Sequence, residues 1–365
     1  MDMIYRNDNT RLKWIDIAKG IAIILVVIGH MLRGFVSAGM CEEYREIIEY
    51  IDFTIYSFHM PIFFIISGIL YKKTTNVKNL KEYLLFIKKK ILTLLIPYFV
   101  FSWMQIGIKL IMSGSVNSEV RIENFYTIIF KPIEQFWFLY ALLFIFIIVA
   151  FIDYIFNDRF IKNIMFLSCF LLSTVFGNPE HIINQIFSNI IYFYIGVDLV
   201  LIKNNINRKN YGRVRSKVIP RNKRNSICLK EQYAIPCILL LYIILNLVCY
   251  NNSFNSWIVI LEKFLLAILG SCFVITICKI NENKKNIIIG LLKLIGKNSF
   301  SIYMLHIIFG AGIRIILIKM SIYNFIVQSV IGLLFAIFIP IILSEIYTYI
   351  KLKLNGKVVV KLAKI

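Results

Sequence analysis

Long apolar stretches with almost no charged residues run through this 365-residue sequence. A helix needs about 20 mostly apolar residues to cross the hydrocarbon core of a bilayer. Ten such stretches lie near residues 15–34, 51–71, 91–112, 136–152, 160–177, 182–202, 234–250, 257–278, 299–318 and 322–350. Because the bilayer offers no partners for backbone N–H and C=O groups, stretches of this length predict helices. We therefore predict an all-α integral membrane protein with about ten transmembrane helices in one bundle.

The composition agrees with this prediction and excludes several other classes. Hydrophobic residues make up 59% of the chain and charged residues 17%, whereas soluble domains contain about 25% charged residues. A soluble α/β enzyme, a secreted disulfide scaffold and a disordered chain are therefore excluded. The seven cysteines are scattered and form no C-x-x-C pair, so we expect neither a disulfide framework nor a bound metal.

The net charge of +21 has two interpretations, nucleic-acid binding or basic loops on one side of a membrane. Positive charges gather at the N-terminus, in 72–90, in 203–231 and after residue 350, whereas the intervening loops carry mixed charges. Assigning alternate loops to one side places most of the 41 Lys and Arg residues there. By the positive-inside rule we expect a multi-pass cell-membrane protein with both termini in the cytoplasm and no nucleic-acid partner.

The domain prediction is a single membrane domain over residues 1–365. Spans 1–6 fall within 11–202 and spans 7–10 within 232–350. The basic segment 203–231 is predicted to be a mobile cytoplasmic loop between them, and 351–365 a basic cytoplasmic tail.

Ionisable residues inside the first span are the clearest candidates for function, because such residues are costly in a membrane and usually face the bundle interior. At 100° per residue, Asp16, Lys19, His30 and Arg33 fall on one stripe of a single helix. Lys19 and His30 are then roughly 16 Å apart along the axis, a span suited to the two ends of one long ligand. The alternative is structural: Asp16 and Lys19 form an i, i+3 pair near the cytoplasmic interface and His30 caps a polar outer end.

The second span contains a further histidine. We expect His59 in mid-span, just before Pro61, which frees a backbone carbonyl and bends the helix. Two histidines in the outer halves of adjacent spans indicate a polar cavity, although a buried core histidine is an equally good interpretation of His59.

Several segments together resemble a known family. The segment Trp14–His30 is similar to the first helix of the membrane acyltransferase-3 family, and more narrowly of its fucose 4-O-acetylase-like branch. Further similar segments follow in the family's order: Phe58–Gly68, then Phe136–Leu139, then Ser299–His306. The family also has ten spans.

The resemblance implies transfer of an acyl group, commonly acetyl from acetyl-CoA, to a hydroxyl of a carbohydrate or another acceptor. The family's hallmark is an arginine followed after ten intervening residues by a histidine. This chain has Lys19 at the arginine position and His30 at the histidine position. Lysine keeps the positive charge but lacks the planar fork of arginine, so the resemblance implies a point-charge role at position 19.

Acyl transfer to a hydroxyl requires a base, stabilisation of the oxyanion and an oriented donor. We predict that His30 is the general base and that Asp16 and Lys19 order the cytoplasmic half of the stripe. His59 is predicted to supply the oxyanion donor or to hold the acceptor.

The predicted donor, acetyl-CoA, is made in the cytoplasm and carries phosphates. We predict that it enters past basic residues, namely Arg11, Lys13, Lys72 and Lys73, with ordinary positive-inside charge as the alternative interpretation. It is a substrate, and no permanently bound cofactor is expected.

For the carbohydrate acceptor we predict contacts from Arg33, Trp137, Tyr303 and His306. Aromatic faces suit sugar rings, but Trp and Tyr are also typical of the interfacial belts of membrane proteins.

A transporter or flippase of a lipid-linked glycan is the alternative function, with the charged stripe as its translocation path. The absence of obvious internal repeats disfavours it, and labelling of product from CoA discriminates between the two. Homo-oligomers and glycan-assembly proteins both remain open as partners.

Overall fold

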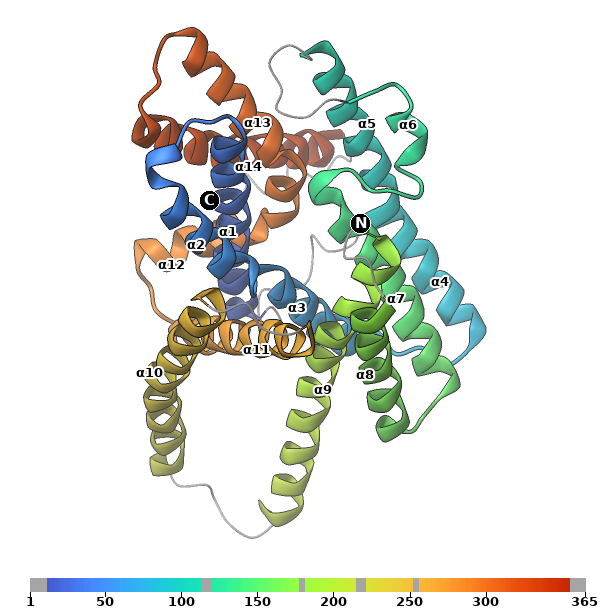
Figure 1. The fold of residues 1–365 in the computed structure, drawn as a ribbon. Coiled ribbons are helices and arrows are strands. Elements are labelled where there is room, and N and C mark those ends of the chain that lie inside the picture. The colour runs from blue at the N-terminus through green and yellow to red at the C-terminus, as the bar shows by residue number, and fades with distance from the viewer. Residues whose placement is uncertain (1–11, 113–119, 177–180, 215–220, 252–255, 355–365) are drawn as a thin grey trace. The chain divides into compact units, whose positions relative to one another are not determined.

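The computed structural model describes residues 12–112, 120–176, 181–214, 221–251 and 256–354, and every regular element in these ranges is a helix (Figure 1). This confirms the predicted all-α membrane class. The predicted donor-binding residue Arg11 and the C-terminal tail beyond residue 354 lie outside the described residues.

The chain separates into two compact units. One, here called the middle unit, is the continuous segment Ser57–Ile280. The other, the terminal unit, combines Leu12–Tyr56 with Asn281–Ile365, of which residues up to 354 are described.

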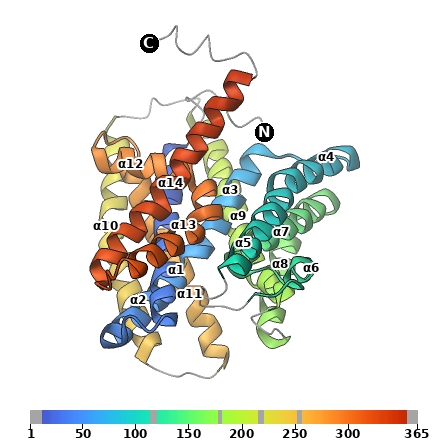
Figure 2. The same cartoon turned by 90° about the horizontal axis from the view of Figure 1, so that it is seen from above.

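The terminal unit is organised around its first helix. Its helices are α1 (Lys13–Ser37), a 3₁₀ turn (Glu42–Tyr44), α2 (Arg45–Tyr56), α12 (Ile287–Lys297), α13 (Ser299–Lys319) and α14 (Phe325–Leu354). Helix α1 packs against α2, α12, α13 and α14, and α13 packs along α14 (Figure 2). The ionisable stripe predicted from the sequence is therefore on the helix that has the most neighbours in this unit.

Two glycines allow α1 and α12 to touch backbone to backbone. A side-chain carbon added at Gly20 would overlap the carbonyl of Leu292, and one added at Gly296 would overlap the carbonyl of Asp16. Small residues at a crossing are a usual way for membrane helices to approach closely. Asp16 thus lies where the two backbones meet.

The middle unit contains the remaining helices. They are α3 (His59–Thr74), α4 (Leu80–Lys90), a π-helical turn (Ile91–Leu95), α5 (Ile96–Ile111), α6 (Asn124–Thr127), a 3₁₀ turn (Glu134–Phe136), α7 (Trp137–Ile155), α8 (Arg159–Phe176), α9 (Ile182–Val214), α10 (Arg221–Asn251) and α11 (Ser256–Asn281). Helix α9 packs against α3, α7 and α8 (Figure 1). Gly68 on α3 and Gly196 on α9 repeat the close crossing, because a side-chain carbon at either would overlap a carbonyl of the other helix.

Each of the ten predicted spans corresponds to one or more helices of the described residues. Eight helical segments of the described chain are long and apolar enough to cross a membrane. The other two predicted spans correspond to α8 and to the apolar part of α10, Ile235–Asn251.

Three details differ from the expectation. The predicted span 51–71 is divided between α2 and α3. The segment 203–231, predicted as a loop, has a helical backbone as far as Val214 and again from Arg221. Helices α4, α6 and α12 were not predicted, because each has too few residues for a span.

Candidate functional site

The inner half of the α1 stripe holds an ion pair. Lys19 Nζ lies 3.7 Å from Asp16 Oδ1, and the side chain of Asp16 is almost fully buried while that of Lys19 is 24% exposed. This is the i, i+3 pair that the structural interpretation of the sequence expects. Asp16 is buried at the crossing of α1 and α12, so the nearby Lys19 charge offsets part of the cost of burying its carboxylate.

The outer half of the stripe joins α1 to α2. Arg33 makes a bidentate pair with Asp52, from Nε to Oδ1 and from Nη2 to Oδ2, both at 2.8 Å. Its guanidinium carbon also lies 3.3 Å from the centre of the Tyr56 ring. That ring packs over Gly29 and meets the His30 ring edge to face, with 6.4 Å between ring centres. The predicted contact between Arg33 and the acceptor remains a prediction.

His306 is the residue that the structure brings to His30. The two ring centres are 5.3 Å apart and the rings are tilted by 52°. His306 is 2% exposed, and its Nδ1 lies 3.0 Å from the Ile302 carbonyl and 2.9 Å from the Tyr303 carbonyl. Within the described residues its Nε2 has no hydrogen-bond partner.

Tyr303, also predicted to contact the acceptor, is buried on the same helix. Its ring centre lies 6.3 Å from that of His306. Five of the predicted site residues of the terminal unit are on α1, namely Lys13, Asp16, Lys19, His30 and Arg33, and two, Tyr303 and His306, are on α13. Lys13, predicted to meet the donor, is exposed at the start of α1.

Cys41, between α1 and α2, is not suited to carry an acyl group. It is buried in an apolar cluster with Leu32, Phe35 and Ile48. This burial, and secondarily the charge of Glu42, raises the pKa of the Cys41 thiol. A raised thiol pKa keeps the group in its less nucleophilic, protonated form.

His59 belongs to the middle unit and is buried, with 1% exposed. It was expected in the middle of a helix, but it is the first residue of α3. Pro61 accordingly lies in the first turn, where a missing N–H leaves no carbonyl of the helix unsatisfied, so it does not bend a continuous helix. The predicted roles of His59 in catalysis remain predictions.

The chain near α3 contains polar residues that sequence reasoning missed. Ser57 Oγ and Tyr242 Oη are 2.9 Å apart, and the buried Asn246 donates to the same Tyr242 oxygen at 3.5 Å. Phe58 covers Gly270 and meets the Tyr242 ring edge to face. An Asn four residues after a Tyr within an apolar helix was the available signal, since polar side chains inside spans seek one another.

Trp137 begins α7 and lies in an aromatic cluster, with its ring centre 6.4 Å from Phe64 and 6.3 Å from Phe138. Three residues earlier, at the start of the preceding 3₁₀ turn, Glu134 has a positive φ of 41°, which non-glycine residues rarely adopt. Its carboxylate pairs with Lys109 and accepts a hydrogen bond of 2.6 Å from Gln105. This polar network was also missed, and its only signal was the ionisable residue Lys109 within an apolar stretch.

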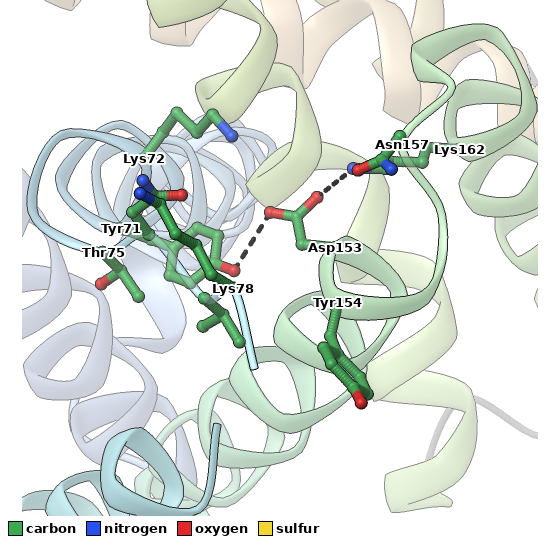
Figure 3. A pocket seen from close by; sticks show the side chains of 10 residues that line it. Tyr71, Lys72, Thr75, Lys78, Asp153, Tyr154, Asn157 and Lys162 are labelled. Carbon is green, nitrogen blue, oxygen red and sulfur yellow. Dashed lines mark hydrogen bonds and ion pairs between the residues drawn. The ribbon is translucent and has the colours of Figure 1, made fainter. Parts of the chain in front are cut away.

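Lys72 lines a polar pocket of about 400 Å³ in the middle unit (Figure 3). On its wall, Asp153 lies between Tyr71, which donates to it at 3.1 Å, and Lys162, whose Nζ lies 2.5 Å away. Lys78 also lines the pocket, whereas Lys73 does not. Because Lys162 neutralises Asp153, the pocket keeps the positive charges of Lys72 and Lys78, which form no ion pair within the described part of the chain.

Within the described ranges, no three His, Cys, Asp or Glu side chains gather as metal ligands would. The helices and their buried ionisable residues define a multi-pass membrane protein with a polar site on α1.

The chain belongs to the acyltransferase-3 family, whose model is described as an acyltransferase domain and matches residues 12–345. It is therefore an acyltransferase by family, and its long apolar helices are those of a membrane protein. No curated protein and no solved structure matches it.

Proposed function

We propose that this membrane acyltransferase moves an acetyl group from acetyl-CoA to a hydroxyl of a cell-surface or lipid-linked carbohydrate, with His30 as the general base. The observation that carries the proposal is the place of His30 on α1, with its ring 5.3 Å from that of the buried His306. The resemblance assigns the motif's histidine to this same position. The resemblance to the fucose 4-O-acetylase-like branch supports the choice of acetyl and of a carbohydrate.

The proposed chemistry is a direct transfer. His30 accepts the hydroxyl proton while the oxygen attacks the thioester carbonyl and a C–O bond forms. The oxyanion then collapses, the C–S bond breaks, and the proton passes from His30 to the CoA sulfur. Histidine suits both steps because its two protonation states are close in free energy near neutral pH.

Lys19 is proposed to act as a point charge and Asp16 to fix its position. The 3.7 Å separation between Lys19 Nζ and Asp16 Oδ1 supports an electrostatic contact. The exposed part of the Lys19 side chain leaves its ammonium accessible to a second anionic group, such as a phosphate of the donor.

The donor phosphates are proposed to meet the basic residues Arg11, Lys13, Lys72 and Lys73. The pocket beside Asp153 supports this role for Lys72 and adds Lys78 to the set. Both charges face a polar space of about 400 Å³, which is large enough for phosphate groups. The high density of Lys and Arg in these loops supports a cytoplasmic location for the loops. It likewise supports a cell-membrane protein whose two termini lie on the cytoplasmic side.

The acceptor is proposed to contact Arg33, Trp137 and Tyr303, while His59 donates to the oxyanion or holds the acceptor. Trp137 and Tyr303 offer aromatic faces, and His59 is buried, which would strengthen any hydrogen bond it makes.

The test is an acetyl-transfer assay on membranes that contain the protein, with acetyl-labelled acetyl-CoA and a mixture of bacterial surface glycans as acceptors. We expect label in the glycan fraction with the wild type and a loss of about 100-fold or more with His30→Ala, because a general base contributes about 10²–10⁴ in rate. Membrane insertion of both proteins is checked by detergent extraction and size-exclusion chromatography.

Full transfer by a correctly inserted His30→Ala variant would exclude His30 as the base. If the wild type moves glycans across vesicles but never incorporates label, the chain acts as a transporter and the proposed function is wrong.

A further inference from the structure

His306 has a fixed proton arrangement. Its Nδ1 approaches two backbone carbonyls, of Ile302 and Tyr303, at 3.0 and 2.9 Å. Carbonyl oxygens only accept hydrogen bonds, so Nδ1 must carry the hydrogen. In the neutral ring the other nitrogen, Nε2, is then a bare acceptor.

This hydrogen-bond acceptor, Nε2 of His306, is buried. The His306 side chain is 2% exposed, and within the described residues Nε2 has no hydrogen-bond partner. Buried polar atoms are nearly always paired, and an exception indicates a use or a missing partner. Helix α13 therefore holds the Nε2 atom of His306 in a fixed orientation inside the terminal unit, as a hydrogen-bond acceptor.

The ring that faces His306 is His30. The two ring centres are 5.3 Å apart, and Nε2 of His306 accepts no hydrogen bond from His30 in this structure. Hydrogen bonds between catalytic groups often tighten only when substrate is bound. On its other flank, His30 meets the edge of Tyr56, and the Arg33 charge beside Tyr56 is paired with Asp52. The bare Nε2 of His306 is able to accept a hydrogen bond from the His30 ring.

We infer that His306 orients His30 for the transfer, accepting a hydrogen bond from one nitrogen of His30 so that the opposite nitrogen faces the acceptor hydroxyl. This inference rests on the proposed function. A base that is oriented by a third group is the arrangement found in hydrolytic triads, where the third group fixes the tautomer and stabilises the cation that forms. Here a neutral histidine, anchored by two carbonyls, takes the place of a carboxylate.

The proton balance follows from this assignment. The hydroxyl proton moves to His30, which becomes a cation, and later moves to the CoA sulfur as the C–S bond breaks. His306 stays neutral throughout and keeps its hydrogen on Nδ1. It is a positioning residue, and the hydroxyl, thioester and thiol account for every proton.

The test compares His306→Phe with His306→Gln in the labelled-acetate assay. Phenylalanine fills the space but cannot accept a hydrogen bond, so we expect kcat to fall by about 100-fold while KM for both substrates changes by less than about twofold. Glutamine places an amide oxygen near the position of Nε2, and we expect it to recover about tenfold over phenylalanine.

A matched control and a double variant separate orientation from packing. Met304→Leu changes another buried side chain of α13 at nearly constant volume, and we expect wild-type kcat. The double variant, His30→Ala with His306→Phe, should be no slower than His30→Ala alone. Once the base has been removed, the residue that orients it has no further effect on the rate.

Additive losses in the double variant, equal activity of the phenylalanine and glutamine variants, or full activity of His306→Phe would each overturn the inference. Its failure is distinguishable from failure of the proposed function, because in the latter case the wild type itself transfers no label or His30→Ala stays fully active.

Discussion

Lys19 stands where the resemblance described above implies an arginine. Lys19 lies 3.7 Å from the buried Asp16 on the same helix. A single charge at that distance is satisfied without the planar geometry of a guanidinium. The contact with Asp16 therefore requires only a point charge at position 19.

We predict that Lys19→Arg keeps most of the transfer activity and that Lys19→Gln loses about tenfold to a hundredfold in kcat/KM. The expected loss corresponds to one charge-assisted interaction of ~1.5–3 kcal/mol. Steady-state kinetics with labelled acetyl-CoA measure it, and Lys284→Gln, an exposed lysine of the terminal unit, serves as the control. A glutamine variant with unchanged kcat/KM would show that the charge has no part in transfer.

The sequence predicted the stripe on α1 but not the residue opposite His30. Asp16, Lys19, His30 and Arg33 follow from the helical repeat alone, which is a local property. The contact between His30 and His306 joins helices from distant parts of the chain, and no local pattern encodes such a pairing. The pairing of Arg33 with Asp52 was missed for the same reason.

At the scale of elements, two glycine crossings determine how closely helices pack. Gly20 and Gly296 bring α1 against α12, and Gly68 and Gly196 bring α3 against α9. The sequence predicted most helices because apolar length is a strong signal. It missed α12, which is too short to span a bilayer, and the break before His59, because the apolar pattern continues through it.

We predict that Gly296→Val lowers the stability of the protein by at least ~1–3 kcal/mol, the usual cost of forcing extra carbon into packed space. The added side chain would overlap the Asp16 carbonyl, which is backbone and cannot rotate away. The effect is measured by heating the protein in detergent and monitoring the loss of its monodisperse chromatographic peak as it unfolds.

Gly290→Ala is the matched control on the same helix, because a side-chain carbon there meets nothing within 4 Å. We expect an unchanged or slightly higher melting temperature, since alanine is the better helix former. Equal melting temperatures for Gly296→Val and wild type would contradict the close crossing of α1 and α12.

At the scale of the whole molecule, the charge distribution predicts how the chain lies in the membrane. Basic residues are dense in alternate loops and scarce in the others, which by the positive-inside rule places both termini in the cytoplasm. This prediction comes from the loops alone and is independent of how the helices pack.

Reporter fusions in a bacterial host test it. A green fluorescent protein at the C-terminus should fluoresce, because it matures in the cytoplasm. Alkaline phosphatase fused after Gly39, in the turn between α1 and α2, should be active, because that enzyme needs the oxidising side of the membrane. The reverse pattern of signals would invert the topology and place the Lys72 pocket outside the cell.

The terminal unit is built from two segments that are far apart in the sequence, and this has a consequence for biosynthesis. Helix α1 is translated early, but its neighbours α12, α13 and α14 follow only after the whole middle unit. During that interval α1 carries Asp16, Lys19 and His30 in the membrane without the helices that later cover them, and uncovered ionisable groups are costly there. If synthesis stops before residue 287, the released chain lacks α12, α13 and α14. The ionisable residues of its α1 are then exposed, and we expect membrane quality control to recognise this chain.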